Sequence, residues 1–213
     1  MAHADVRELC PSIVAPDSLD LVLTDPPYPR AFMECWRWLG DFAQAALKPG
    51  GTLAALSGQM WLGEVLAMLG REGLAYRWTV ALNLPGASTR VFHRRLGSRW
   101  KPCLLFTKAG GEPPRWLGTD VATAPTLAAQ ADGFHHWGQS AGAMDALASL
   151  LVEPGMVACD PFAGGGELAL AAALAGASVL ASDIEAEHVA TMRASIVNVA
   201  ESETTRRRQG ALL

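Results

Sequence analysis

The sequence lacks the features that mark several large classes of protein. Its four cysteines, Cys10, Cys35, Cys103 and Cys159, are scattered and form no CxxC pair, so neither a zinc site nor a disulfide framework is indicated and buried thiols are expected. No apolar run approaches the length of a membrane span, and the N-terminus does not combine a basic start with an apolar segment. The sequence therefore predicts a soluble, intracellular protein that binds neither a metal nor a membrane.

Acidic residues are absent from one long stretch. Between Glu72 and Glu112 there is none, and that stretch holds Arg77, Arg90, Arg94, Arg95, Arg99, Lys101 and Lys108 together with His93. The net charge of the chain is −4, so its surface is not basic throughout. A segment of one sign in an acidic protein is typical of a phosphate-binding surface. A solvated basic loop is the alternative.

The remaining composition and patterning predict one α/β domain. At 213 residues, half of them hydrophobic, the chain can bury a sizeable core. Buried strands are expected at 19–24, 52–56, 76–82, 103–107, 156–160 and 178–182, and helices at 31–48, 59–69, 142–151, 167–175 and around 189–199. This alternation predicts a mostly parallel sheet covered by helices.

The stretch Asp25-Pro26-Pro27-Tyr28 follows the first of these strands. Two prolines fix the backbone as the chain leaves the sheet and leave carbonyls without neighbouring N–H donors. The Asp25 carboxylate and these carbonyls can accept hydrogen bonds, and Tyr28 offers a flat ring. Acceptors beside an aromatic ring suit a flat heterocycle with an exocyclic amino group. A proline-rich turn, with Tyr28 as a core aromatic residue, is the alternative.

A second candidate site follows the strand at 156–160. The sequence Asp160-Pro161-Phe162-Ala163-Gly164-Gly165-Gly166 leads into a helix, and the next strand ends at Asp183. A glycine turn lets the backbone approach a ligand closely, and an acid at this distance can bind ribose hydroxyls. The pattern is that of a mononucleotide-binding unit, although the full GxGxxG pattern of dinucleotide enzymes is absent. A glycine turn that binds nothing is the alternative.

Together these motifs resemble those of the S-adenosylmethionine-dependent DNA amino-methyltransferases, which methylate adenine N6 or cytosine N4. The resemblance covers most of the chain except 83–134. It implies that Asp25, Pro26, Pro27 and Tyr28 are catalytic, and that the cofactor is S-adenosylmethionine. The residues implied to bind this cofactor are Asp5, Asp25, Asp160, Phe162, Ala163, Gly164, Gly166, Asp183 and Ser140. Ser140 lies in His136-Trp137-Gly138-Gln139-Ser140-Ala141, where the family usually has His-Pro-Thr-Gln-Lys-Pro, and only His and Gln match.

The order of the motifs, catalytic before glycine-rich, resembles the circularly permuted β group of bacterial and phage enzymes. This resemblance implies a Rossmann-like methyltransferase fold with a mostly parallel seven-stranded sheet and helices on both faces. It also implies a cytoplasmic location, in a bacterial cell or a phage-infected host.

The function implied is transfer of a methyl group to adenine N6 in double-stranded DNA after base flipping. Adenine is expected because most adenine enzymes of the family have Asp at the first motif position, whereas cytosine-N4 enzymes more often have Ser. Residues 83–134 are expected to contact DNA, with Arg90, Arg94, Arg95, Arg99 and Lys101 neutralising phosphates. A homodimer or a partner subunit would complete so short a recognition segment, and 201–213 is expected to be a flexible tail. The alternatives are a cytosine-N4 DNA methyltransferase, an RNA methyltransferase, or a noncatalytic cofactor-binding subunit of a methyltransferase complex.

Overall fold

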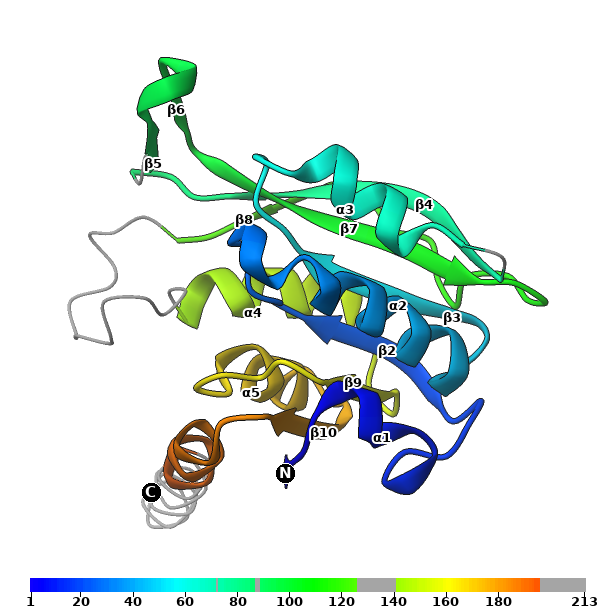
Figure 1. Cartoon of the computed structure of the whole chain (residues 1–213). Helices are drawn as coiled ribbons and strands as arrows, with labels where there is room; N and C mark the ends of the chain where they lie inside the picture. The colour runs from blue at the N-terminus through cyan, green and yellow to red at the C-terminus, as the bar shows by residue number, and fades with distance from the viewer. Residues whose placement is uncertain (72, 87–88, 126–140, 196–213) are drawn as a thin grey trace, which may run out of the picture.

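The computed structural model describes residues 1–71, 73–86, 89–125 and 141–195. In this part of the chain an eight-stranded sheet runs in the order β1-β10-β9-β2-β3-β7-β4-β8 (Figure 1). Its strands are β1 Ala2–His3, β2 Leu19–Thr24, β3 Leu47–Leu56, β4 Leu74–Asn83, β7 Trp100–Lys108, β8 Val121–Thr123, β9 Val157–Asp160 and β10 Ser178–Asp183. Strand β7 is antiparallel to β3 and β4, and every other pairing in this sheet is parallel.

The sheet is therefore mostly parallel, as predicted, but the predicted count of seven strands is wrong. The short strands β1 and β8 form its two edges. Strand β8 has three residues, of which only Ala122 is buried, so it shows no hydrophobic period. Strand β1 has two residues, too few to show a hydrophobic period, so it cannot be predicted from the sequence pattern either.

Helices cover both faces of the sheet. Successive residues of a strand point to opposite faces, so Val22 of β2 joins one buried cluster while Leu21 and Leu23 join another. The first cluster packs under α1 Val6–Ser12, α2 Glu34–Ala46 and α3 Leu62–Leu69, and the second under α4 Ala141–Leu151 and α5 Glu167–Leu174. A last helical stretch covers 186–195, and its Val189 and Met192 pack on Ala181. No helix in the described ranges is long and apolar enough to span a bilayer.

The helix expected over 31–48 is interrupted and ends early. A 3₁₀ turn, η1 Arg30–Phe32, precedes α2, which ends at Ala46 because Leu47 already has extended dihedral angles. Gly50 and Gly51, which follow the expected helix, lie inside β3, where the register with β2 shifts between Leu47 and Thr52. Gly50 has a φ of +82°, and a Cβ there would meet the Glu112 carbonyl oxygen at 2.3 Å. Gly50 thus lets the neighbouring loop approach the irregular start of β3.

The range 83–134 divides into different structures. A hairpin of β5 Thr89–Val91 and β6 Leu96–Ser98, joined by the 3₁₀ turn η2 Phe92–Arg94, projects beyond the main sheet (Figure 1). Strand β7 lies between β3 and β4 and is part of the core. Residues 126–134, the expected tail at 201–213, and the end of the last predicted helix at 196–199 lie outside the described residues.

Candidate active site

The two motifs meet at one edge of the sheet. Strands β2 and β9 are parallel neighbours, so the residues that follow their carboxyl ends lie together. The Thr24 hydroxyl at the end of β2 donates a hydrogen bond of 2.6 Å to Asp160 Oδ1 at the end of β9, and both side chains are buried. This bond joins the start of the Asp25 segment to the start of the glycine turn.

The Asp25 segment forms a compact group at this edge. Pro26 is buried, and Asp25, Pro27 and Tyr28 are half-buried. The Tyr28 hydroxyl donates a hydrogen bond to Asp25 Oδ1. Burial, the charge of Asp25 and this hydrogen bond all raise the pKa of Tyr28, so its hydroxyl remains a proton donor. The ring and the carboxylate are therefore held as one unit.

The glycine turn is ordered by the carboxylate at the end of β10. Asp183 Oδ2 accepts the Gly164 N–H at 2.9 Å, and Asp183 Oδ1 accepts the Glu185 N–H at 2.9 Å and lies 3.1 Å from His188 Nδ1.

Two glycines of this turn have positive φ values but different surroundings. Gly164 has a φ of +51°, and a Cβ added there would meet no atom within 4 Å. Gly166 has a φ of +89°, and its Cβ would lie 2.6 Å from Met192 Cγ. Gly164 thus faces open space, whereas Gly166 is required for close packing.

The carboxylates of this edge influence one another. Burial, helped by the charges of Asp25 and Asp183, raises the pKa of Asp160 to about 7, although hydrogen bonds from Thr24 and from the Phe162 N–H oppose the rise. Phe162 is half-buried and Ala163 is buried, and Ala163 donates its N–H to the Ser182 carbonyl at 3.0 Å. The negative charge of this edge therefore comes from Asp25 and Asp183, beside which Asp160 tends to hold its proton.

Asp5 also lies beside this region but is engaged in local contacts. Strand β1 pairs with the end of β10, placing His3 opposite Asp183, and Ala4 donates its N–H to the Asp183 carbonyl at 3.1 Å. The Asp5 side chain caps α1 by accepting the Arg7 N–H at 2.9 Å. It also pairs with the Arg7 guanidinium, which lowers the pKa of Asp5. Ser140 lies outside the described residues.

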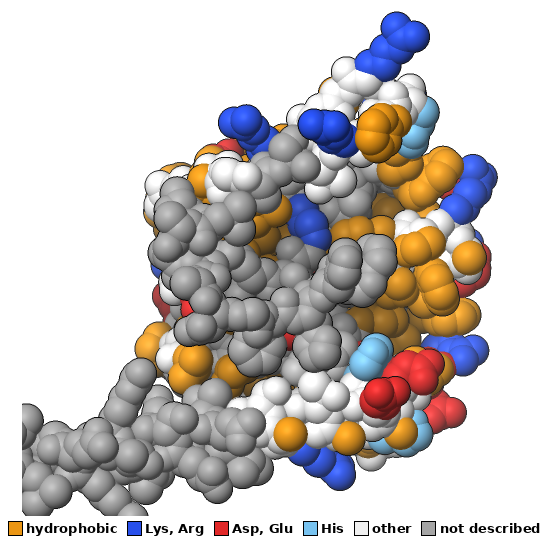
Figure 2. Space-filling view, turned by 90° about the vertical axis from the view of Figure 1, so that its left-hand side faces the viewer, with side chains coloured by type: hydrophobic (Ala, Val, Ile, Leu, Met, Phe, Trp, Pro, Cys, Tyr) orange, Lys and Arg blue, Asp and Glu red, His pale blue; other side chains and the backbone are white. Residues whose placement is uncertain are grey.

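The predicted DNA-contact residues fall into two groups. Arg90, Arg94, Arg95 and Arg99 are exposed on the hairpin and at its base. Figure 2 looks onto the edge where the strands end and shows Lys and Arg side chains projecting at the top, where the hairpin lies. Lys101 differs: it is half-buried, and its Nζ lies 5.2 Å from the centre of the Tyr28 ring.

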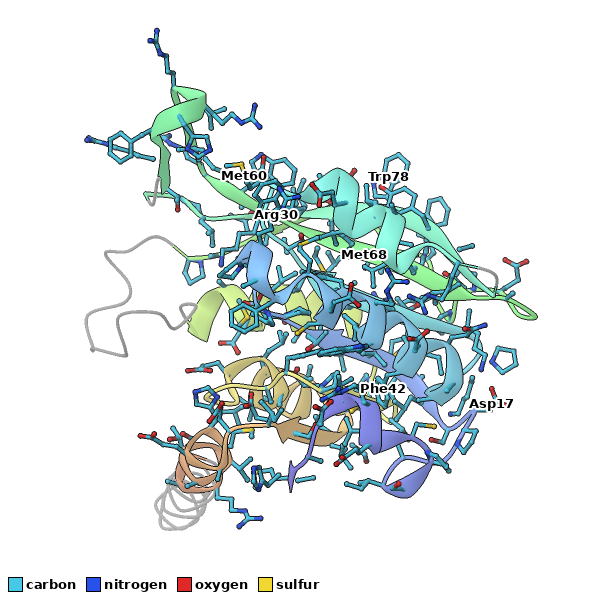
Figure 3. All side chains as sticks on the ribbon, in the orientation of Figure 1. Asp17, Arg30, Phe42, Met60, Met68 and Trp78 are labelled. Atoms are coloured by element: carbon cyan, nitrogen blue, oxygen red, sulfur yellow. The ribbon has the colours of Figure 1, made fainter. Side chains whose placement is uncertain are left out.

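A cavity of about 480 Å³ lies between the hairpin and Tyr28. Its lining comes from Tyr28, the loop Ser57–Met60, the hairpin, and the start of β7 with Lys101. Gln59 holds the hairpin on this loop, because its Nε2 donates to Ser98 Oγ at 3.1 Å and to the Trp100 carbonyl at 3.0 Å. Met60, labelled in Figure 3 below the hairpin, has its sulfur 3.5 Å from His93 Nε2. Sequence reasoning missed this loop, since it placed the start of a helix at Gln59.

Comparison with known proteins supports the resemblance drawn from the motifs. The family model of the D12 class N6 adenine-specific DNA methyltransferases matches residues 144–209, which include the glycine turn and Asp183. No curated protein sequence matches the chain.

Solved structures share the fold, and three of them illustrate the likeness. The complex of M1.HpyAVI with SAM superposes with a TM-score of 0.70 at 18% identity, covering 91% of this chain and 97% of that one. TTHA0409 of Thermus thermophilus, a putative DNA modification methylase, gives 0.69 at 18% identity, with 92% of each chain covered. The cytosine-N4-specific PvuII DNA methyltransferase gives 0.72 at 16% identity, with 89% and 83% covered. The resemblance to the DNA amino-methyltransferases is thus confirmed, and the chain has their α/β fold.

Proposed function

We propose that the protein transfers a methyl group from S-adenosylmethionine to the exocyclic N6 of adenine in double-stranded DNA. The observation that carries the proposal is the hydrogen bond between Thr24 and Asp160. It holds the Asp25 segment and the glycine turn at one edge of the sheet, as methyl transfer from a cofactor to a base requires. The solved structures of M1.HpyAVI and TTHA0409 in complex with SAM support the choice of cofactor.

The residues at this edge fit the cofactor in charge and in space. S-adenosylmethionine supplies an electrophilic methyl group on a positively charged sulfonium, and the Asp25 and Asp183 carboxylates place negative charge at this edge. The open space at Gly164 leaves room for a ligand against the backbone of the turn. Asp183, already ordering this turn, would also bind the ribose hydroxyls, and Ser140 would contact the methionine carboxylate.

The Asp25 segment would align the base. Asp25 and the Pro26 carbonyl accept the two amino hydrogens, which directs the nitrogen lone pair at the methyl carbon. S-adenosylmethionine would supply the methyl group, with the carbon–sulfur pair returning to sulfur; Asp25 would stabilise the positive charge that grows on the amino nitrogen, and the excess amino proton would pass to solvent water. Tyr28 would stack on a base that has been flipped out of the duplex.

DNA would lie across the hairpin and the cavity beneath it. The exposed side chains of Arg90, Arg94, Arg95 and Arg99 would neutralise phosphates there. Of these, Arg94 also lines the cavity above Tyr28, so phosphate contact and base entry would occur on the same side. Double-stranded DNA is therefore the partner that best fits this face.

Cytosine is the second candidate base, favoured by the similarity to the cytosine-N4-specific PvuII enzyme. Both amino groups offer the same two donors, so Asp25 alone does not discriminate between them by its chemistry. Asp at the first motif position, common in the adenine enzymes that the motifs resemble, supports adenine.

The assignment of Asp25 is tested by Asp25→Ala. We expect it to abolish methylation of DNA while thermal unfolding stays cooperative. Asp20→Ala is the control: Asp20 lies near the start of β2 and pairs with Lys48, so the variant should lose stability but keep turnover per folded molecule. If Asp25→Ala turned over like the wild type, Asp25 would not be the acceptor, and a wild type that bound cofactor but never methylated DNA would be a noncatalytic subunit.

A further inference from the structure

Lys101 occupies a position that phosphate binding does not explain. It lies near the start of β7, yet its ammonium group reaches across the end of β3 to lie 5.2 Å from the centre of the Tyr28 ring. It lines the cavity together with Tyr28 and the loop Ser57–Met60. The arginines of the hairpin are exposed, whereas Lys101 is half-buried and lies beside the ring of Tyr28.

The charges around Asp25 show what this lysine can do. Tyr28 donates a hydrogen bond to Asp25 from its own segment, Asp160 presents a second carboxyl from β9, and the buried Cys103 thiol lies on β7. Among these groups Lys101 carries the positive charge; burial lowers the pKa of Lys101, and the Asp25 carboxylate offsets part of that lowering. A cation near a carboxylate favours its ionised form, whereas a neighbouring carboxyl opposes it.

Asp25 can act as proposed only when ionised. A carboxylate has acceptor sites on both oxygens, so it can take the Tyr28 hydroxyl and still accept an amino hydrogen of the base. A protonated carboxyl presents an O–H donor in place of one of those sites and would oppose the amino donor.

We propose that Lys101 is a positioning residue that keeps Asp25 ionised and holds Tyr28 beside it by contact with the ring. This inference deepens the function proposed above and rests on it for its catalytic consequence. Its electrostatic part concerns the protein alone and can be measured without DNA or cofactor.

The test compares Lys101→Met and Lys101→Arg with the wild type. The pKa of Asp25 is followed by the ¹³C resonance of its carboxyl, assigned with Asp25→Asn, and the pH profile of kcat/KM is measured on duplex DNA. Lys101→Met should raise the Asp25 pKa and the acid limb of the profile by about one unit or more, whereas Lys101→Arg should restore both toward the wild type. Lys108→Met is the matched control: Lys108 ends the same strand and pairs with Asp17, so its loss should leave the Asp25 pKa unchanged.

An unchanged Asp25 pKa in Lys101→Met would overturn the inference, even if activity fell at every pH, since a lost phosphate contact would do that. A raised pKa in a protein that never methylates DNA would instead uphold the electrostatic role and refute the proposed function. Cooperative unfolding of all variants, measured alongside, excludes loss of the fold as the cause.

Discussion

The buried carboxyl of Asp160 gives the stability of this protein a distinctive dependence on pH. Burial raises its pKa from 3.8 to about 7 in the folded protein. Between these two values the folded state holds a proton that the unfolded chain releases, so unfolding is favoured as pH rises. The stability that Asp160 contributes is therefore fully present below the unfolded pKa and is lost as pH increases toward the folded pKa, with no further loss above it.

The size of the effect follows from the shift. Each unit of pKa difference corresponds to about 1.4 kcal/mol, so the loss between pH 4 and pH 7 is on the order of 4 kcal/mol. Asp160→Asn removes the titration, while its amide oxygen can still accept the hydrogen bonds from Thr24 and from the Phe162 N–H. The variant should therefore gain stability relative to the wild type as pH rises through this range.

Urea denaturation from pH 5 to pH 8, without cofactor, measures this difference directly. The free energy of unfolding of Asp160→Asn minus that of the wild type should rise by roughly 2 kcal/mol between pH 5 and pH 7 and level off toward pH 8. Asp120→Asn, at an exposed carboxylate that accepts the Trp78 Nε1–H, is the control and should show no such rise. A difference that stayed flat would refute the argument that burial beside two other carboxylates keeps Asp160 protonated.

Two further predictions concern the ligand surfaces. Gly164→Leu should weaken S-adenosylmethionine binding at least 100-fold by calorimetry. Gly155→Leu is the control, because Gly155 also has a positive φ and open space around its Cβ position but lies before the amino end of β9. It should lower the free energy of unfolding by ~1–2 kcal/mol, as Gly164→Leu should, and leave the affinity for S-adenosylmethionine unchanged. If both variants bound S-adenosylmethionine with the same affinity, the glycine turn would not be the cofactor site. Replacing Arg94 and Arg95 by Ala should reduce the slope of log K for DNA binding against log salt concentration by about two. The control variant, Arg193→Ala on the last helix, should leave this slope unchanged. If the double variant also left the slope unchanged, the arginines of the hairpin would be an ordinary solvated surface.

Much of the fold is readable from the sequence because buried parallel strands are short apolar runs separated by amphipathic helices. The strand before Asp25 and the strand before the glycine turn are both predicted for this reason. The antiparallel place of β7 between β3 and β4 is not, since strand order depends on pairing between distant residues such as Ala54 and Leu105. The early end of α2 escapes prediction because Leu47 continues the apolar spacing of the helix, although it already belongs to β3.

Some residues of the candidate site can likewise be predicted from the sequence, and others cannot. Asp25, Tyr28, Gly164 and Asp183 stand in motifs whose chemistry can be read locally. The role inferred for Lys101 is not predictable, because a lysine in a basic stretch looks like its neighbours until its side chain is seen over the Tyr28 ring. The loop Ser57–Met60 carries no motif, and its part in the cavity depends on the hairpin that packs on it.

Methylation of adenine in DNA is the activity on which the proposed roles of Asp25, Tyr28 and Lys101 all depend, and it can be detected directly. Unmethylated duplex DNA is incubated with the protein and S-adenosylmethionine bearing a deuterated methyl group, digested to nucleosides and analysed by mass spectrometry. We expect labelled N6-methyladenine from the wild type and none from Asp25→Ala. Labelled N4-methylcytosine alone would contradict the choice of base, and the absence of any labelled nucleoside, with cofactor bound, would contradict the proposed activity itself.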